Sequence, residues 1–361
     1  MISAEDIDRI ETVVVLTGLG IGAVLGLVSR YAGYCTVGAI SDWYSSGDTG
    51  RMRMWLLAIA TAMLGTQALI SVNGIAIDDS FYIAPRVFWL SNILGGLVFG
   101  FGMVLASGCG SRTLIRIGGG SLKALVVFLV MAIFAYMTMR GIFGVLRVQT
   151  IERISVTLST KQDLASLLGQ PRFAVAGIVG TILFTLALAS REFRQRPRLL
   201  IGGVMIGAMV VAGWWTTGHL GFIAEDPNTL EPRFIATNTR GVESLTFVAP
   251  LAYWLDLFMF WSDASRILTF SVATVTGVVL GAFGHAVVTK SFRLEGFIDR
   301  QDLSRHLIGA ALMGIGGVVA FGCTIGQGIS GLSLMAVGSL LATAAIVAGG
   351  WLGLAWTERS A

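Results

Sequence analysis

The hydrophobic positions of this chain gather into long stretches separated by short polar segments. About nine of these stretches are long enough, or nearly so, to cross a hydrocarbon core of roughly 30 Å. A further apolar stretch, 247–261, contains Pro250 and Asp256, and we interpret it as interfacial or re-entrant. The pattern predicts an all-α integral membrane protein, with transmembrane helices over 12–29, 54–72, 92–107, 122–139, 173–190, 199–215, 266–288, 306–321 and 332–351.

The composition indicates the same solvent. The chain has 361 residues, of which 55% are hydrophobic and 13% are charged, whereas soluble domains carry about 25% charged residues. Its mean hydropathy is +0.79, so we expect a lipid bilayer around it. The net charge is +4, and the basic residues lie in short runs rather than in one stripe, which argues against a nucleic-acid partner.

The short polar segments predict the orientation. The N-terminal sequence MISAEDIDRIE is acidic where a secretory signal peptide would be basic, so we expect the first apolar stretch to stay in the protein. Basic loops remain on the cytoplasmic side, and REFRQRPR at 191–198 is the most basic of them. Alternating outward from this loop places the N-terminus in the periplasm and the C-terminus in the cytoplasm.

A shift of 214 residues lays NILGGLVFGFGMVLASGC (92–109) on HLIGAALMGIGGVVAFGC (306–323), with Cys109 falling on Cys323. We therefore predict one transmembrane transport domain over 1–361 that arose by duplication. Its parts are a first repeat at 12–139, a connector with one odd helix at 140–198, and a second repeat at 199–351. One odd helix inverts the second repeat in the membrane, as in transporters whose substrate site lies near the midplane between broken helices.

A glycine precedes each cysteine by the same interval along the chain. Gly26 precedes Cys35, Gly100 precedes Cys109, and Gly314 precedes Cys323. The segment GAMVVAGWWTTG has the same spacing from Gly207 to Thr216. We predict four copies of a unit in which a long helix ends in a loop or half-helix, with three of the four ending on cysteine.

The glycines beside the cysteines predict the chemistry of the site. Gly108, Gly110, Gly322, Gly326 and Gly328 are expected to let the backbone leave the helix and expose N–H groups, which favours an anion. A thiol adds a weak S–H donor and a polarisable sulfur, so a sulfur-containing anion fits best. The candidate substrate-binding residues are Cys35, Cys109, Cys323, Gly108, Gly110, Gly322 and Gly326.

Other interpretations of these residues compete with this one. A cysteine in a transmembrane helix is often only a small packing residue. The chain has no C-x-x-C pair and its three histidines lack ligand spacing, so we expect neither a metal nor a cofactor. Weaker candidates are Asp42, His219, Asp256 and Asp263 as proton carriers, and Arg112 and Arg116 as groups that attract an anion or hold lipid phosphate.

Three motifs resemble those of the YeeE/YedE family of bacterial inner-membrane proteins: GYCTVGAISDWYSSGD (33–48), GGLVFGFGMVLASGCGSRTLIRIGGGSLKALV (95–126) and GGVVAFGCTIGQGISGLSLMAVGSLLA (316–342). The resemblance implies a transporter, not an enzyme, which takes up thiosulfate for sulfur assimilation and passes it along Cys35, Cys109 and Cys323 by hydrogen bonds from S–H to sulfur. It also implies half-helices and a cytosolic sulfur carrier of the TusA type as partner. Alternatives are another sulfur or selenium compound as substrate, or a membrane enzyme of thiol–disulfide chemistry, which would normally need a paired cysteine.

Overall fold

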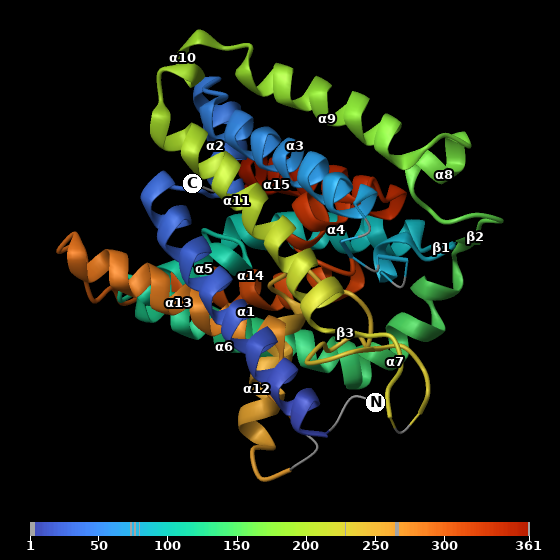
Figure 1. The fold of residues 1–361 in the computed structure, drawn as a ribbon. Helices are drawn as coiled ribbons and strands as arrows, with labels where there is room; N and C mark the ends of the chain where they lie inside the picture. Colours follow the sequence, from blue (N-terminus) through green and yellow to red (C-terminus); the bar gives the residue numbers. More distant parts are fainter. Residues whose placement is uncertain are drawn as a thin grey trace.

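The structure, a computed structural model, describes residues 4–72, 74–75, 77–78, 80–227, 229–263 and 267–359. The protein is an all-α integral membrane protein (Figure 1). Its helices are α1 (Ala4–Ala32), α2 (Thr36–Ser46), α3 (Gly50–Ser71), α4 (Trp89–Leu105), α5 (Gly110–Gly118), α6 (Leu122–Arg140), α7 (Ile142–Gln149), α8 (Leu164–Leu168), α9 (Arg172–Leu188), α10 (Arg191–Arg194), α11 (Pro197–Trp215), α12 (Ala249–Met259), α13 (Phe270–Val288), α14 (Arg300–Val319) and α15 (Val337–Arg359), with the short helical segments η1 (Phe81–Ile83), η2 (Ile151–Arg153), η3 (Thr216–Leu220) and η4 (Gly326–Gly331).

Within the described residues, 7 helical segments are long and apolar enough to cross a membrane. They contain α1, α3, α4, α6, α11, α13 and α15, at seven of the stretches expected from the sequence; residue 266, the first of one such stretch, lies outside the described residues. The other two expected crossings fall on α9, which has 17 residues, and on α14, whose first turns carry charged side chains. Nine crossings therefore stay a prediction. The stretch at 247–261 forms α12, whose 11 residues are too few to span a bilayer.

The long helices of the first half pack against those of the second half. Helix α1 packs along α13 and α11 packs along α3; in the same way α4 packs along α15 and α14 packs along α6. Each helix of one half thus lies against a helix of the other, and Figure 1 shows the blue α1 beside the orange α13. Such crossed pairs are what two similar halves related by a two-fold rotation would produce.

The repeated glycines lie where these pairs touch. A Cβ added at each would lie too close to a backbone carbonyl oxygen of the partner helix and to the amide nitrogen four residues later. Only glycine therefore lets the two helix backbones meet. The contacts join Gly26 to Val278 and Ala282, Gly100 to Ile346 and Gly350, Gly207 to Ala58 and Ala62, and Gly314 to Met131 and Ala135.

Helices α4 and α14, which the sequence repeat superposes, cross through four further glycines. A Cβ added at Gly95 would lie 2.8 Å from the carbonyl oxygen of Gly316, and one added at Gly309 would lie 2.7 Å from that of Gly102. Gly309 and Gly316 are the repeat partners of Gly95 and Gly102. The two glycine-to-carbonyl contacts of the crossing are therefore equivalent under the repeat.

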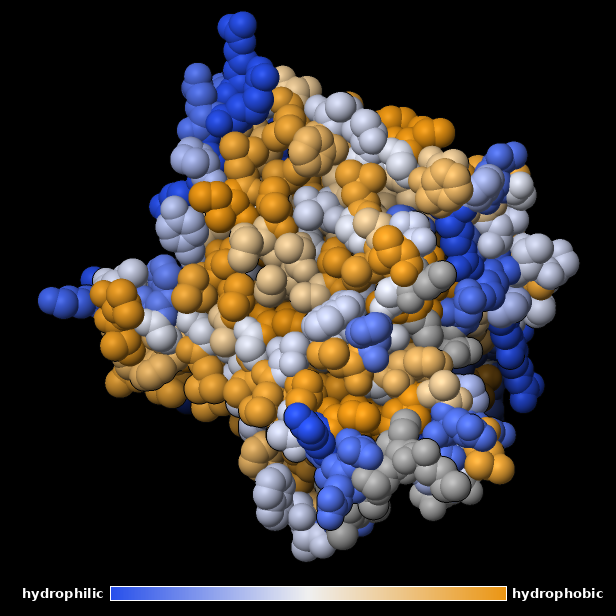
Figure 2. All heavy atoms as spheres, in the orientation of Figure 1, coloured by the Kyte–Doolittle hydropathy of each residue, from blue (hydrophilic) through white to orange (hydrophobic). Residues whose placement is uncertain are grey.

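The polar segments lie at the ends of the helices. Strand β1 (Arg86–Val87) pairs antiparallel with β2 (Val156–Thr157), in the register Arg86 to Thr157, and β3 (Phe222–Ile223) pairs with β4 (Arg233–Phe234). Figure 2 shows hydrophobic side chains over the middle of one face, with hydrophilic ones gathered towards α10 and the end of α13 and, opposite, towards β2 and α7. This is the distribution expected of a membrane protein.

Candidate functional site

The three cysteines follow helix ends that have the same backbone geometry. The residue two before each cysteine is left-handed: Gly33 has φ 68°, Ser107 has φ 55° and Phe321 has φ 57°. The next N–H then donates to a carbonyl five residues back, which is the bond that closes a Schellman motif. These hydrogen bonds join Tyr34 to Ser29 (2.9 Å), Gly108 to Met103 (2.9 Å) and Gly322 to Gly317 (2.8 Å).

This geometry separates the roles of the glycines. The left-handed residue lies one position before Gly108 and Gly322, so Ser107 and Phe321 carry that part of the turn and its strain, about 1–3 kcal/mol for a residue with a side chain. Gly322 itself has φ 159°, a conformation that residues with a side chain rarely adopt, so a glycine is favoured there. Gly326 is required for another reason, because a Cβ there would lie 2.5 Å from the Thr246 hydroxyl. Gly110 has only ordinary contacts, the nearest at 3.4 Å.

Each cysteine then begins the next short segment. Cys35 and Cys109 are the N-cap residues of α2 and α5. The Cys35 sulfur accepts a hydrogen bond from the Gly38 N–H at 3.3 Å, and the Cys323 sulfur accepts one from the Gly326 N–H at 3.4 Å. The sequence Cys-Thr-x-Gly therefore forms the same turn twice. Cys109 differs, since its sulfur lies 3.3 Å from the Ser111 hydroxyl.

The structure brings the three cysteines together, although they are far apart in sequence. Cys109 interacts electrostatically with both Cys35 and Cys323. The buried Tyr34 side chain interacts with all three. Cys109 and Cys323 are buried and Cys35 is partly exposed, and all three thiols are free. Cys109 thus lies near each of the other two cysteines.

Several buried polar atoms around these cysteines lack a hydrogen-bond partner of good geometry. They are the hydroxyl oxygens of Tyr34, Thr36 and Thr324 and the indole nitrogen of Trp55. The Trp55 ring packs against η4, the segment after Cys323. Buried polar groups are nearly always paired, so a set of free donors points to a polar ligand. Only the threonine that follows two of the cysteines gave a sequence signal for them.

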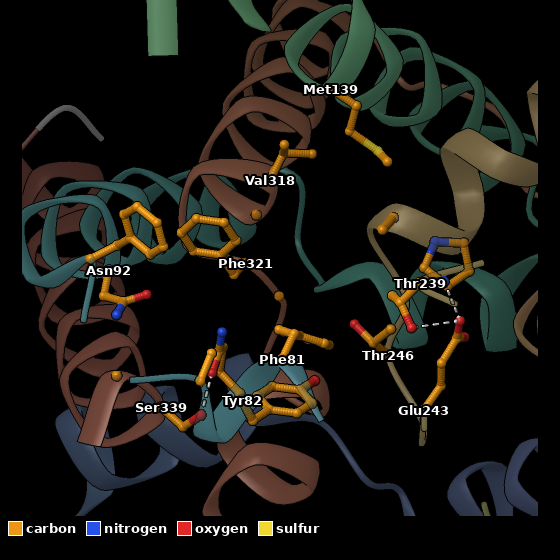
Figure 3. Close-up of a pocket in the computed structure, with 18 of the residues that line it drawn as sticks. Phe81, Tyr82, Asn92, Met139, Thr239, Glu243, Thr246, Val318, Phe321 and Ser339 are labelled. Atoms are coloured by element: carbon orange, nitrogen blue, oxygen red, sulfur yellow. Dashed lines mark hydrogen bonds between the residues drawn. The ribbon is translucent and has the colours of Figure 1, made fainter. Parts of the chain in front are cut away.

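A cavity of about 440 Å³ adjoins Cys323; we call it the Cys323 cavity. Phe321, Gly322 and Gln327 line the part nearest Cys323 in the chain, and η1, α12, the segment 239–246 and parts of α4, α6, α7, α14 and α15 also contribute to the lining. Figure 3 shows Thr239 and Glu243 on one wall and Asn92 on the other, with Phe321 between them. Its lining also includes three cations, Arg86, Arg140 and Arg147, which suit an anionic ligand.

A second cavity, of about 590 Å³, adjoins Cys35; we call it the Cys35 cavity. Gly33, Arg51, Arg196 and Arg198 line it together with Asp42 and Asp48. The Cys35 cavity lies at the start of α11. The Cys323 cavity is lined in part by Glu243, which is hydrogen-bonded to Thr217 just after the end of α11. The two ends of α11 are roughly 28 Å apart at 1.5 Å per residue. The two cavities thus lie towards opposite ends of α11, one beside the turn of Cys323 and the other beside the turn of Cys35.

Ion pairs partly neutralise the Cys35 cavity. Arg51 pairs with Asp42 at 3.2 Å, and Arg196 pairs with Asp48 at 2.9 Å. The hydrogen bond from Arg196 holds the pKa of the Asp48 carboxyl below its usual value. Of the proton carriers suggested by the sequence, Asp42 is therefore an ion-pair partner, and Asp256 accepts a hydrogen bond from Tyr136 at 2.7 Å.

Arg112 lies beside the cysteines, as its place after Cys109 suggested. It interacts electrostatically with Cys35, and with Arg30 of α1. Arg116, in contrast, pairs with Glu295 at 3.3 Å. Within the described residues, no group of three or more His, Cys, Asp and Glu side chains is arranged to hold a metal ion.

Comparison with known proteins now identifies the family. The model of the sulphur transport family matches residues 31–352. The chain belongs to the sulphur transport family. This confirms the resemblance to YeeE/YedE proteins that the cysteine loops predicted, and with it the expectation of a transporter rather than an enzyme.

Members of the sulphur transport family with curated names align over nearly the whole chain. The thiosulfate transporter TsuA of Escherichia coli (strain K12) is 27% identical over 94% of this chain and 90% of its own length. The TsuA protein of Spirochaeta thermophila is 27% identical over 94% of this chain and 98% of its own. The probable transporter YedE of E. coli matches over only 24% of this chain, at 28% identity.

Proposed function

We propose that this protein takes up thiosulfate across the bacterial inner membrane for sulfur assimilation. One observation carries the proposal: three cysteines in closely similar turns lie close together, Cys109 interacts with both of the others, and cavities whose linings include arginines adjoin the turns of Cys323 and Cys35. The names of the full-length relatives support thiosulfate as the substrate.

The groups of the site match the two ends of thiosulfate. Its terminal sulfur is soft and carries part of the charge, so it suits the weak S–H donors of the cysteines. Its three sulfonate oxygens suit N–H and O–H donors, and the Thr324 hydroxyl, the Trp55 indole N–H and the neighbouring hydroxyls of Tyr34 and Thr36 supply such donors near the cysteines. A sulfate ion lacks the soft end and gains nothing from the thiols.

The order of the cysteines follows from the cavities. Thiosulfate enters the Cys323 cavity, passes from Cys323 to Cys109 and then to Cys35, and leaves through the Cys35 cavity. The basic loop at 191–198, which contributes Arg196 and Arg198 to the Cys35 cavity, makes that cavity the cytoplasmic one. The N-terminus is then periplasmic and the C-terminus cytoplasmic, the two halves form an inverted repeat, and a sulfur carrier of the TusA type meets the Cys35 side.

The transfer between cysteines is non-covalent. A covalent step needs a thiolate, and apolar surroundings keep a thiol neutral. Under non-covalent transfer, Cys109→Ser keeps an O–H donor and gives partial uptake, whereas covalent transfer predicts none. Mass spectrometry of protein quenched during turnover tests this directly, because added sulfur on a cysteine at substantial occupancy would overturn it.

The decisive experiment is uptake of labelled thiosulfate by cells that lack other sulfur importers, with labelled sulfate as the control. We expect uptake of thiosulfate and not of sulfate. Excess unlabelled selenium and sulfur oxyanions should compete weakly; strong competition by one of them would make that compound the substrate. Reporter fusions at both termini test the orientation, and two tags on the same side would exclude nine crossings.

A further inference from the structure

Glu243 is an unusual residue to find in a cavity for an anion. It is the only carboxylic acid among the described residues that line the Cys323 cavity, and its side chain is 5% exposed. No Lys, Arg or His side chain in the described part of the chain forms an ion pair with it. An ionised carboxylate there would be buried without a counter-charge and would repel a dianion.

The surroundings hold this carboxyl in one place. Its Oε1 accepts hydrogen bonds from the N–H of Thr239 at 2.8 Å, from the Thr239 hydroxyl at 3.1 Å, and from the N–H of Asn238. Figure 3 shows the bonds to Thr239 at the edge of the cavity. The Glu243 N–H itself donates to the hydroxyl of Thr217 at 3.1 Å, so the backbone is fixed independently of the side chain.

Thr217 belongs to the repeat unit without a cysteine. In that unit Thr216 stands where the others have cysteine, and Thr217 stands where two others have Thr36 and Thr324. The threonine hydroxyls of the two cysteine units are unpaired, whereas that of Thr217 both accepts from the Glu243 N–H and donates to the Glu243 carbonyl at 2.5 Å. The fourth unit thus holds the backbone of Glu243 in place beside the cavity.

We propose that Glu243 binds thiosulfate as a neutral acid, so that each dianion entering the Cys323 cavity is accompanied by the uptake of one proton at this carboxyl. The protonated group donates its O–H to a sulfonate oxygen while Oε1 keeps its three donors. This deepens the proposed function and rests on it. It assigns to Glu243 a role as a substrate-binding residue and as the origin of a pH dependence.

The other groups that face Glu243 leave it as the titrating group of the cavity. Tyr82 of η1 and Tyr253 of α12 interact with it electrostatically, and both phenols are neutral at physiological pH. Arg86, Arg140 and Arg147 line the same cavity, and Arg147 is paired with Glu152 at 3.1 Å. Burial raises the pKa of the Glu243 carboxyl, although the hydrogen-bond donors of Thr239, Asn238 and Ser271 oppose this rise.

The test is calorimetry of thiosulfate binding to the purified full chain from pH 5.5 to 8.5, in buffers of different ionisation enthalpy. Above the pKa of the free carboxyl, we expect close to one proton taken up per thiosulfate and an apparent Kd that rises up to tenfold per pH unit. Glu243→Gln keeps the acceptor oxygen and adds an N–H donor, so it should bind without proton uptake and with a flat pH profile.

Two further variants distinguish titration of the Glu243 carboxyl from a general disturbance of the structure. Glu243→Asp retains a titrating group and should retain proton uptake. Thr239→Ala removes one donor from the charged form and should move the midpoint of the pH profile upward. If wild-type protein binds thiosulfate with no proton uptake, or Glu243→Gln keeps the wild-type profile, the inference is wrong while the proposed function stands. If wild-type protein does not bind thiosulfate, both fail together.

Discussion

The turns at Cys323 and Cys35 have the same local geometry and opposite surroundings. In both, the sulfur accepts from the N–H three residues on, and the hydroxyl of the next threonine is unpaired. Cys323 is buried beside a cavity that Phe321 helps to line, whereas Cys35 is partly exposed beside a cavity of ion pairs. Under the proposed function, the first turn would hold thiosulfate away from water and the second would release it.

We expect the largest loss of thiosulfate uptake from substitution of the two buried cysteines, Cys109 and Cys323. We expect Cys109→Ala and Cys323→Ala each to reduce thiosulfate uptake to background, because each removes a donor that no neighbouring thiol replaces. Uptake of labelled thiosulfate by whole cells measures this, and membrane expression should stay near that of the wild type. Normal uptake by Cys109→Ala would refute the proposed path.

Substitution of the partly exposed Cys35 by alanine should reduce thiosulfate uptake less than substitution of the buried cysteines. We expect Cys35→Ala to lower uptake several-fold without abolishing it, since water in the adjoining cavity can solvate the departing anion. The same uptake assay, run beside Cys323→Ala, measures the ratio of the two losses. An equal loss of uptake in Cys35→Ala and Cys323→Ala would show that the greater exposure of Cys35 makes no difference to transport.

The matched glycines of the two turns give a sharper comparison. A Cβ at Gly326 would lie 2.5 Å from Oγ1 and 2.9 Å from Cβ of Thr246, a short side chain that cannot swing away, whereas one at Gly38 would come too close only to the flexible end of Arg51. We expect Gly326→Ala to cost about 1–3 kcal/mol of stability and Gly38→Ala less than about 0.5 kcal/mol. Thermal unfolding in detergent compares them, and the reverse order would contradict the packing described for Gly326.

The smallest effect concerns the Asp48–Arg196 pair of the Cys35 cavity. Because the pKa of Asp48 is lowered in the folded protein, the pair stabilises it fully above the unfolded-state pKa of about 3.9, and the effect is lost as the pH falls through the folded-state value. Asp48→Asn should therefore lower the Tm slightly at pH 7, because exposed pairs contribute about 0.2–1 kcal/mol.

At pH 3 the difference in Tm between Asp48→Asn and the wild type should shrink. A difference that stays constant between pH 7 and pH 3 would mean that the carboxylate charge plays no part. Arg196→Gln provides the matched variant from the other side of the pair.

The sequence was sufficient for the membrane class, the family and the spacing of the cysteine units. Each of these depends on local composition or on residues close together in the chain. Which residue takes the left-handed conformation was not predictable in this way, because Ser107 and Phe321 are held there by the surrounding fold and not by their own preferences. The boundary of α14 was also missed, since its first polar turns lie outside the apolar stretch.

The remaining residues of the site come from segments that no motif connects. Trp55 lies within a long apolar helix, and Glu243 lies in a polar loop; neither has a repeat partner or a characteristic spacing. Their role becomes visible only when η4 packs on Trp55 and Thr217 holds the loop of Glu243. Such contacts join distant parts of the chain, so single-sequence patterns do not encode them.

The backbone contacts at Gly26, Gly100, Gly207 and Gly314 also determine how the two halves can move. Helices that touch through their main chains have no side chain there to repack, so sliding is costly and tilting about the contact is the easier motion. Each contact is then a pivot, and in α1, α4 and α14 the five or six helical residues after the glycine form a lever of roughly 8 Å at 1.5 Å per residue, ahead of the turn that carries the cysteine. A tilt of about 5° about such a pivot would move the end of the helix by only about 0.7 Å, the scale on which a hydrogen bond lengthens and weakens.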